Sequence, residues 1–226
     1  MDDLGVRHDE IRGAKGNWEK VLHAMRLART LQKGAPHVTV GIHTVVSRFN
    51  VERFPEIYRE LKALAPDSYI TEVAEERVEL GTVGKGITPS PDEYDAVADF
   101  LVAETRKSRS KAPMGRLVEA FRLEYYRLCQ EVLHRGEQAI PCYAGWASAQ
   151  IAPDGYLWCC CVRAEPVGSL RECGYDFARA WFSPEADRFR GSVRAKECAC
   201  PLANASYTNM LVSPRSLLRV ARNLLR

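Results

Sequence analysis

The sequence predicts an α/β fold that is followed by a small cysteine-rich α+β module. A nearly continuous apolar, β-branched segment at 38–46, a helical pattern at 51–64 and a second strand pattern at 67–74 follow one another with short links. Such a strand–helix–strand unit requires a parallel sheet. The cysteines gather between Cys142 and Cys200, and hydrophobic residues make up 46% of the 226 residues, enough to bury a core.

Capping residues and periodicity predict the remaining elements in order. Helices are expected at 17–34, 90–105, 116–134 and 214–226, separated by a glycine- and proline-rich loop at 81–91 and a basic linker or helix break at 106–111. Asn17 caps the first of these helices, and Ser90-Pro91-Asp92-Glu93 is a helix start.

The last helix follows Ser213-Pro214 and is strongly amphipathic. Its apolar face carries Leu217, Leu218, Ala221, Leu224 and Leu225, and its basic face carries Arg215, Arg219, Arg222 and Arg226. A terminal amphipathic helix most often covers a domain core with its apolar face, which is the expectation here. Contact with an anionic membrane surface or with a partner is the alternative.

The most specific feature is the cysteine spacing Cys142-x12-Gly155-x4-Cys160 followed by Cys198-Ala199-Cys200. Thiolates from two separated pairs can close a small fold around iron or zinc. Residues 152–156 read as a hairpin turn between strands at 148–152 and 156–160, and the second strand would deliver a thiol.

The cysteine triplet in the second strand leaves a choice of ligand. Strand alternation turns Cys160 to the face opposite Cys159 and Cys161, and Cys160 satisfies the glycine spacing, so it is the expected ligand, with Cys161 in reserve. Cys129 and Cys173 are expected to be structural thiols. A zinc knuckle or a group of buried free thiols is the alternative to an iron–sulfur cluster.

Residues from about 140 to 214 resemble the SPASM domain, the iron–sulfur extension of many radical S-adenosylmethionine enzymes. The resemblance rests on Cys142-Tyr-Ala-Gly-Trp146, Pro153-Asp154-Gly155 with Trp158 to Cys161, Gly168 to Glu172, Tyr175 to Phe177 with Trp181 to Ser183, and Glu197 to Asn204. Upstream, residues 8–16, strand 38–46 and Asn50 are similar to the second half of a radical S-adenosylmethionine partial barrel.

The resemblance implies one auxiliary 4Fe-4S cluster on Cys142, Cys160, Cys198 and Cys200. It also implies a role in modifying a peptide or another metabolite. The family's Cys-x3-Cys-x2-Cys signature is absent, because no cysteine precedes Cys129. S-adenosylmethionine would therefore be used only if the missing N-terminal half were supplied.

On this resemblance the chain is a truncated relative or the C-terminal part of such an enzyme, inactive alone. The expected domains are a barrel remnant at 1–110, a bridging helix at 111–139, a SPASM-like domain at 140–214 and the terminal helix at 215–226. An unpaired sheet edge would favour self-association or a chain that supplies the missing strands. The alternative is a non-catalytic scaffold stapled by iron–sulfur or zinc.

Bulk properties narrow the function classes. A net charge of +3 is too small to indicate nucleic acid, and no segment approaches the roughly twenty apolar residues of a membrane span. No signal segment opens the chain, so a soluble, cytoplasmic protein is expected. Catalytic residues are unknown: His8, Asp9, Arg12, His43, Glu72, Glu75 and Arg77 all have ordinary structural roles open to them.

Overall fold

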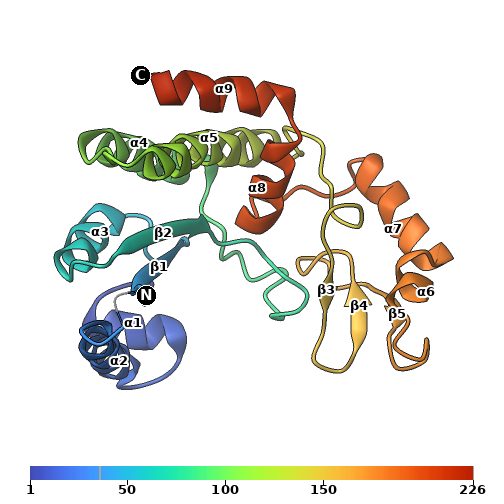
Figure 1. Cartoon of the computed structure of the whole chain (residues 1–226), viewed down its shortest axis with the longest axis horizontal. Helices are drawn as coiled ribbons and strands as arrows, with labels where there is room; N and C mark the ends of the chain where they lie inside the picture. The colour runs from blue at the N-terminus through green and yellow to red at the C-terminus, as the bar shows by residue number, and fades with distance from the viewer. Residues whose placement is uncertain (36, 226) are drawn as a thin grey trace. The chain divides into compact units, whose positions relative to one another are not determined.

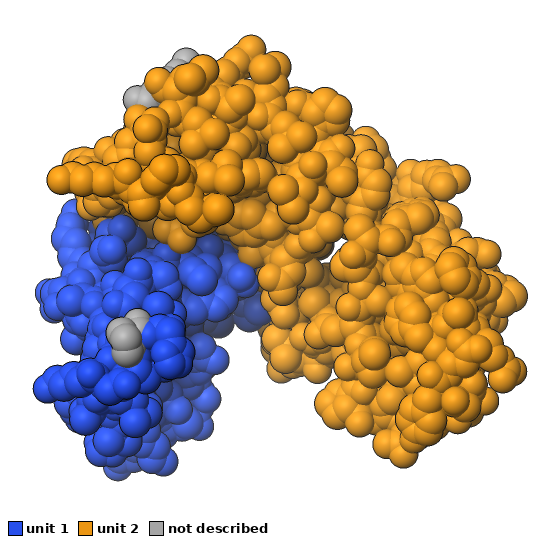
Figure 2. Space-filling model, viewed as in Figure 1, with its two compact units in different colours: residues 1–74, 87–97 blue, residues 75–86, 98–226 orange. Residues whose placement is uncertain are grey.

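The computed structural model describes residues 1–35 and 37–225, which divide into two compact units (Figure 2). Unit 1 comprises Met1–Ala74 and Ile87–Val97, and unit 2 comprises Glu75–Gly86 and Ala98–Arg226. The chain leaves unit 1 twice, so each unit is built from two separate stretches of sequence. Helices and small sheets occur together, in agreement with a mixed α/β class.

Unit 1 contains the predicted strand–helix–strand segment. Its helices are α1 (Gly5–Arg12), α2 (Asn17–Gln32), α3 (Phe54–Ala63) and the first part of α4 (Pro91–Lys107). The strands β1 (Gly41–Val46) and β2 (Ser68–Val73) pair in parallel on either side of α3 in the sequence. Phe54, Ile57 and Leu61 of α3 are fully buried. The parallel pairing and the connecting helix are therefore as predicted.

Burial along these strands differs from the expectation. The apolar segment 38–46 predicted a strand buried on both faces, yet buried and more exposed residues alternate along β1 and β2, and Ile70 is 43% exposed. One face of the pair is covered and the other is open. In the described residues β1 and β2 pair only with each other, so they form no barrel, and the barrel remnant stays a prediction.

The candidate polar residues near the N-terminus act as packing groups. His8 is buried; its Nδ1 accepts the Asp2 N–H at 3.2 Å, and its Nε2 lies 2.8 Å from Asn17 Oδ1. Asp9 accepts the N–H groups of Gly16 and Trp18 at the start of α2, and these bonds lower its pKa. These contacts tie α1 to α2.

Three further candidate residues lie on or near the two strands. His43 is exposed on β1, and its Nε2 lies 3.5 Å from the Glu72 carboxylate on β2. Arg12 lies 2.6 Å from a carboxylate oxygen of Asp2. Each of these pairs has the geometry of an ordinary ion pair.

Two long helices lead toward the cysteines. α4 begins with a capping box: the Ser90 N–H donates to Glu93 Oε2 at 2.7 Å, and the Glu93 N–H donates to Ser90 Oγ at 3.3 Å. α5 (Pro113–Arg135) contains the predicted helix 116–134 and ends at Gly136, whose φ is 63°. Among the described residues, no helix has the length and apolar composition of a membrane span.

The cysteine module of unit 2 is built around a three-stranded antiparallel sheet (Figure 1). Its elements are β3 (Gln150–Ile151), β4 (Tyr156–Trp158), β5 (Pro166–Ser169), α6 (Phe177–Trp181), α7 (Pro184–Arg194) and α8 (Ala203–Leu211). The predicted hairpin turn forms: the Ala152 N–H donates to Tyr156 O at 2.8 Å, and Gly155 has a φ of 93°. Leu157, Val167, Ala180 and Phe189 form the centre of the module's core.

The terminal helix α9 (Pro214–Leu225) packs along α5, as Figure 1 shows. The side that it buries is not the leucine face that the sequence predicted. Ser216 and Val220 are buried, whereas Leu217, Leu218 and Leu225 are 41%, 55% and 88% exposed. The expectation that its leucines cover the core is wrong; Arg226, predicted on the basic face, lies outside the described residues.

The reason for this packing is a group of charges on α5. Arg215 lies 3.3 Å from a carboxylate oxygen of Glu131, and Arg219 lies 3.6 Å from the same oxygen and 3.9 Å from Glu124. Glu124 is buried. A buried carboxylate requires a cation, and Arg219, on the side of α9 that also buries Ser216 and Val220, lies near it, whereas Arg215 and Arg222 stay exposed.

Candidate metal centre

Cys160 occupies a turn and not the strand predicted for it. β4 ends at Trp158, and the Ala164 N–H donates to Cys160 O at 2.9 Å, closing one turn of chain. The thiol of Cys161 hydrogen-bonds to the Cys160 sulfur, and the N–H groups of Val162 and Arg163 also point to it. These contacts lower the pKa of Cys160 to about 6 despite its burial.

The three adjacent cysteines differ in their surroundings because of this turn. The difference does not come from the strand alternation that the sequence predicted. Cys161 donates to Cys160 and is buried, which raises its own pKa. Cys159 is 2% exposed and belongs to the core of the module. Burial also raises the pKa of Cys159. Of the three thiols, Cys160 is the one best prepared to be a thiolate.

Cys142 lies beside α8. Burial raises its pKa, while the N–H of Ala144 and the side-chain amide of Asn209 hydrogen-bond to the sulfur and favour the thiolate. Asn209 is buried, and its Oδ1 accepts the Tyr143 N–H at 2.9 Å, which fixes the amide so that its NH₂ is free for sulfur. The spacing of the cysteines gave no sign of Asn209, because nothing in the sequence distinguishes it from other polar residues of a helix.

Cys198 and Cys200 complete the predicted set. Burial raises the pKa of both thiols, to about 12 for Cys200. The Arg163 guanidinium hydrogen-bonds to Cys198, and the Leu202 N–H hydrogen-bonds to Cys200. Gln138 Nε2 lies 3.8 Å from the Cys200 sulfur. Each of the two sulfurs therefore faces a donor, as Cys142 and Cys160 do.

The structure brings the four predicted sulfurs into electrostatic range of one another. A negative charge on Cys160 raises the pKa of Cys142, and charges on Cys142 and Cys160 raise the pKa of both Cys198 and Cys200. In the described part of the chain, no three cysteine sulfurs lie within 4.8 Å of one another. The four thiols therefore affect one another's pKa without forming a tight group of three.

The remaining thiols stand apart from this arrangement. Cys129 is fully buried, and its Sγ donates to Pro201 O at 3.9 Å. Cys173 is partly buried against the core of the module. Their assignment as structural thiols stays a prediction.

Two segments outside the cysteine motif support the turn at Cys160. The Arg163 Nη1 donates to Ser192 Oγ at 2.6 Å, and its guanidinium lies over the Phe189 ring at 4.6 Å. The segment Glu75–Gly86 contributes the Val78 N–H, which donates to Val162 O at 2.9 Å.

In the same segment Arg77, one of the candidate residues, hydrogen-bonds to the buried Glu75 carboxylate. Its positive charge also acts on Cys161. Glu75 and Arg77 thus form a charge pair within unit 2.

Comparison with known families identifies the module. Residues 142–201 match the family model of SPASM, an iron–sulfur cluster-binding domain. This segment is therefore similar to an iron–sulfur cluster-binding domain, and Cys142, Cys160, Cys198 and Cys200 lie within it. Searches of curated proteins and of solved structures give no match.

Proposed function

We propose that Cys142, Cys160, Cys198 and Cys200 hold one 4Fe-4S cluster, with Cys161 as the reserve ligand at the third position of the triplet. The observation that carries this proposal is the set of donors around the four sulfurs. Each sulfur accepts at least one hydrogen bond from an N–H group or from a neighbouring thiol, and all four interact electrostatically. Such hydrogen bonds orient thiolate ligands and set the reduction potential of an iron–sulfur cluster.

The sulfur spacing supports a cluster over a single zinc ion. Zn–S bonds of about 2.3 Å in a tetrahedral site place the sulfurs about 3.8 Å apart. No three of these sulfurs are within 4.8 Å in the residues that the structure covers. A cluster spreads its irons over a larger volume, so its ligands stand farther apart.

When bound, such a cluster with four cysteine ligands would supply a one-electron store. The chain's own residues hold and shield it: Asn209 fixes Cys142, Arg163 fixes Cys198 and the 160–164 turn fixes Cys160. All four sulfurs are partly buried, which limits contact with oxygen and water.

Metal analysis after anaerobic purification tests this proposal. We expect a brown protein with about four irons and about four sulfides per chain, the composition of one cubane. A colourless protein with stoichiometric zinc would contradict the proposal. Cys142→Ser should lose the iron, and Cys173→Ser, a matched thiol of the same module outside the set, should keep it.

We further propose that the chain is related to the C-terminal part of a radical S-adenosylmethionine enzyme that modifies a peptide or another metabolite. Two observations support this: a parallel strand–helix–strand unit precedes a SPASM module, and the two strands lack further partners in the described residues. Two-stranded sheets are marginal alone. A second copy, or a chain that supplies further strands, would complete the sheet.

An assay for 5′-deoxyadenosine separates this proposal from a scaffold role. No cysteine precedes Cys129, so the sequence offers no three-thiolate site with an open iron position, and the chain alone should not cleave S-adenosylmethionine under dithionite. Cleavage by the isolated chain would overturn the four-cysteine assignment. A candidate partner that restores cleavage only with the iron-loaded chain would support the enzyme relationship; dependence on the partner alone would favour the scaffold.

A further inference from the structure

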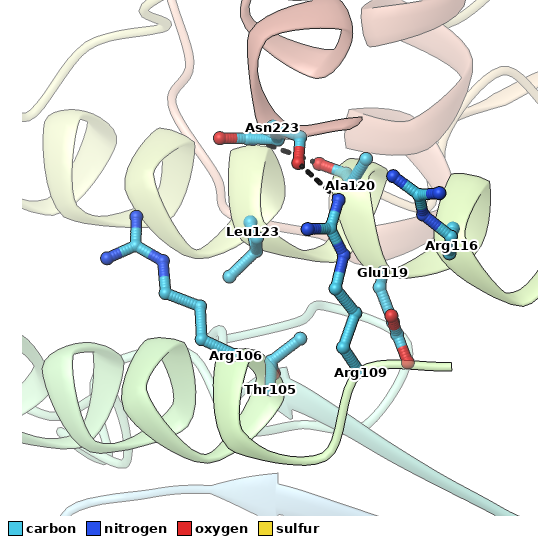
Figure 3. Close-up of a pocket in the computed structure, with 8 residues that line it drawn as sticks. All are labelled: Thr105, Arg106, Arg109, Arg116, Glu119, Ala120, Leu123 and Asn223. Atoms are coloured by element: carbon cyan, nitrogen blue, oxygen red, sulfur yellow. Dashed lines mark hydrogen bonds between the residues drawn. The ribbon is translucent and has the colours of Figure 1, made fainter. Parts of the chain in front are cut away.

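A cleft lined by arginines lies in unit 2 between the end of α4, α5 and α9 (Figure 3). It consists of two cavities of about 310 and about 320 Å³. Both are lined by Arg106, Leu123 and Asn223, so they adjoin. We call them together the arginine cleft. No cysteine lines it, and it is separate from the metal centre.

The arginine cleft carries a large surplus of positive charge. Six arginines and two glutamates line it, which leaves four positive charges in excess; the arginines are Arg106, Arg109, Arg116, Arg127, Arg219 and Arg222, and the glutamates are Glu119 and Glu124. Arg127 hydrogen-bonds to Glu124 and Glu131. Among the described residues, Arg106 and Arg222 form no ion pair. Glu131, just outside the lining, therefore offsets part of the excess through Arg127 and Arg219, whereas Arg106 and Arg222 keep uncompensated charges in the part of the chain that the structure describes.

Contacts at the end of α9 hold part of this charge in place. Arg109 and Arg116 each donate an Nη2 hydrogen bond to Leu224 O at 2.7 Å, and Figure 3 shows Arg109 reaching toward α9 from below the cleft. Asn223 Nδ2 donates to Ala120 O at 3.2 Å and joins α9 to α5. Each of these two guanidinium groups is thus held by its Nη2, and its other N–H groups can donate to a ligand.

Arg219 provides an independent sign of a missing partner. It lines the second cavity, and its Nη1 is buried but makes no hydrogen bond within residues 1–35 and 37–225. The nearest carboxylate oxygens, on Glu131 and Glu124, are 3.6 and 3.9 Å away. These carboxylates are within ion-pair distance but too far to accept a hydrogen bond, and a buried N–H without a hydrogen bond is costly, so an acceptor is expected beside Arg219 Nη1.

We propose that the arginine cleft binds a small organic molecule that carries several phosphate groups. Guanidinium groups match phosphate oxygens in geometry, and the several negative charges of a polyphosphate complement the positive excess of the cleft. The combined volume lies in the range of small-molecule sites, about 300–1,000 Å³. Val102 and Leu123 offer an apolar wall for an organic group. No aromatic side chain lines the described cleft, so stacked single-stranded nucleic acid does not fit.

Calorimetry with ATP, free of divalent metal, tests the proposal on the whole chain of 226 residues. ATP should bind, and ionic strength near ~1 M, where the screening length is about 3 Å, should weaken it. Arg106→Gln and Arg222→Gln should each lower the affinity roughly tenfold, about 1.4 kcal/mol, because each removes one charged donor to phosphate at an exposed position. Both residues are exposed, so the melting temperature of the free protein should not change. Arg188→Gln on α7 is the control, since Arg188 is exposed and outside the cleft.

Two other probes identify the ligand chemistry. Tripolyphosphate should bind more weakly than ATP, because it lacks the organic group that Val102 and Leu123 would contact. Citrate should bind more weakly still. Equal binding of citrate and ATP would overturn the phosphate assignment. Binding of ATP that is unchanged in both arginine variants, or no binding at all, would overturn the site.

Discussion

The metal centre and the arginine cleft differ in how their charged groups are paired with partners from the protein. Around the four sulfurs, every group that would carry negative charge meets a donor from the protein: Asn209, Arg163, Leu202 or the 160–164 turn. Along the cleft, arginines outnumber glutamates, and the buried Nη1 of Arg219 has no hydrogen-bond acceptor among the described residues. The four sulfurs thus have protein donors beside them, whereas the cleft keeps an excess of positive charge over the carboxylates that line it.

The largest expected effect is loss of the iron–sulfur cluster on substitution within the cysteine triplet, which tests whether the protein donors select the ligand. Cys160→Ser should abolish the iron–sulfur absorbance, because the 160–164 turn aims its N–H groups at this sulfur. Cys159→Ser and Cys161→Ser should keep it, measured by absorbance and iron content after anaerobic reconstitution. If Cys161→Ser loses the cluster and Cys160→Ser keeps it, the reserve ligand is the true one and the donor argument fails.

The next effect tests whether packing positions the sulfurs without metal. A Cβ on Gly168 of β5 would lie 2.9 Å from Ala180 Cβ and 3.1 Å from its Cα. Gly168→Ala should lower the free energy of unfolding of the metal-free chain by about 1–3 kcal/mol, measured by urea denaturation. Gly191→Ala on α7 is the control: its Cβ would meet nothing within 4 Å, and it should stabilise by roughly 0.5–1 kcal/mol. Equal effects of the two would show that β5 is not tightly packed on α6.

A smaller expected effect is a change in the reduction potential of the cluster when Arg163, the donor beside Cys198, is replaced. Arg163→Gln removes a positive charge beside Cys198, so the reduced cluster should become less stable and the midpoint potential more negative. A shift on the order of 50 mV is expected, since 59 mV is a factor of ten for one electron. Arg163→Lys, which keeps the charge, should shift less in protein-film voltammetry. A potential that is the same in all three proteins would mean that Arg163 is only structural.

The smallest effect concerns Glu124, the buried carboxylate near Arg219 of α9. Burial raises the pKa of Glu124 above its ordinary 4.5, outweighing the Arg127 hydrogen bond. A raised carboxyl pKa favours the folded state at low pH, and this contribution is lost as pH rises through the raised value. Glu124→Gln should therefore flatten the fall in stability between about pH 4 and about pH 7. The measurement is urea denaturation across that range, and parallel curves for the two proteins would contradict the assignment.

The sequence supported a specific hypothesis for the metal centre and none for the cleft, because cysteine has few roles. The positions Cys142, Cys160, Cys198 and Cys200 could be proposed from spacing and resemblance alone. Asn209 and Arg163 could not, since their contacts with sulfur depend on how α8 and the 160–164 turn pack. Arginine is common on helix surfaces, so no spacing indicated that α4, α5 and α9 would bring six of them together.

The fold shows the same limit. Periodicity predicted the strands, most helices and the amphipathic character of α9, yet it gave the wrong inward face. Apolar burial favoured the leucines, but the buried Glu124 and the nearby Glu131 require cations, and that requirement appears only when α5 and α9 are side by side. The strand predicted at 156–160 ends at Trp158, because the chain turns after Cys160 and the N–H groups of this turn hydrogen-bond to the Cys160 sulfur.

The Val78–Val162 hydrogen bond bears on how this module could be moved between proteins. The family-matched stretch 142–201 is continuous, but the segment Glu75–Gly86 that supports the 160–164 turn comes from far upstream and belongs to the same compact unit. A gene fusion that transplants only the cysteine-bearing stretch would carry the ligands and leave this brace behind. Fragments for recombination or expression should therefore be cut along the unit, with Glu75–Gly86 rejoined by a linker, and not along the sequence.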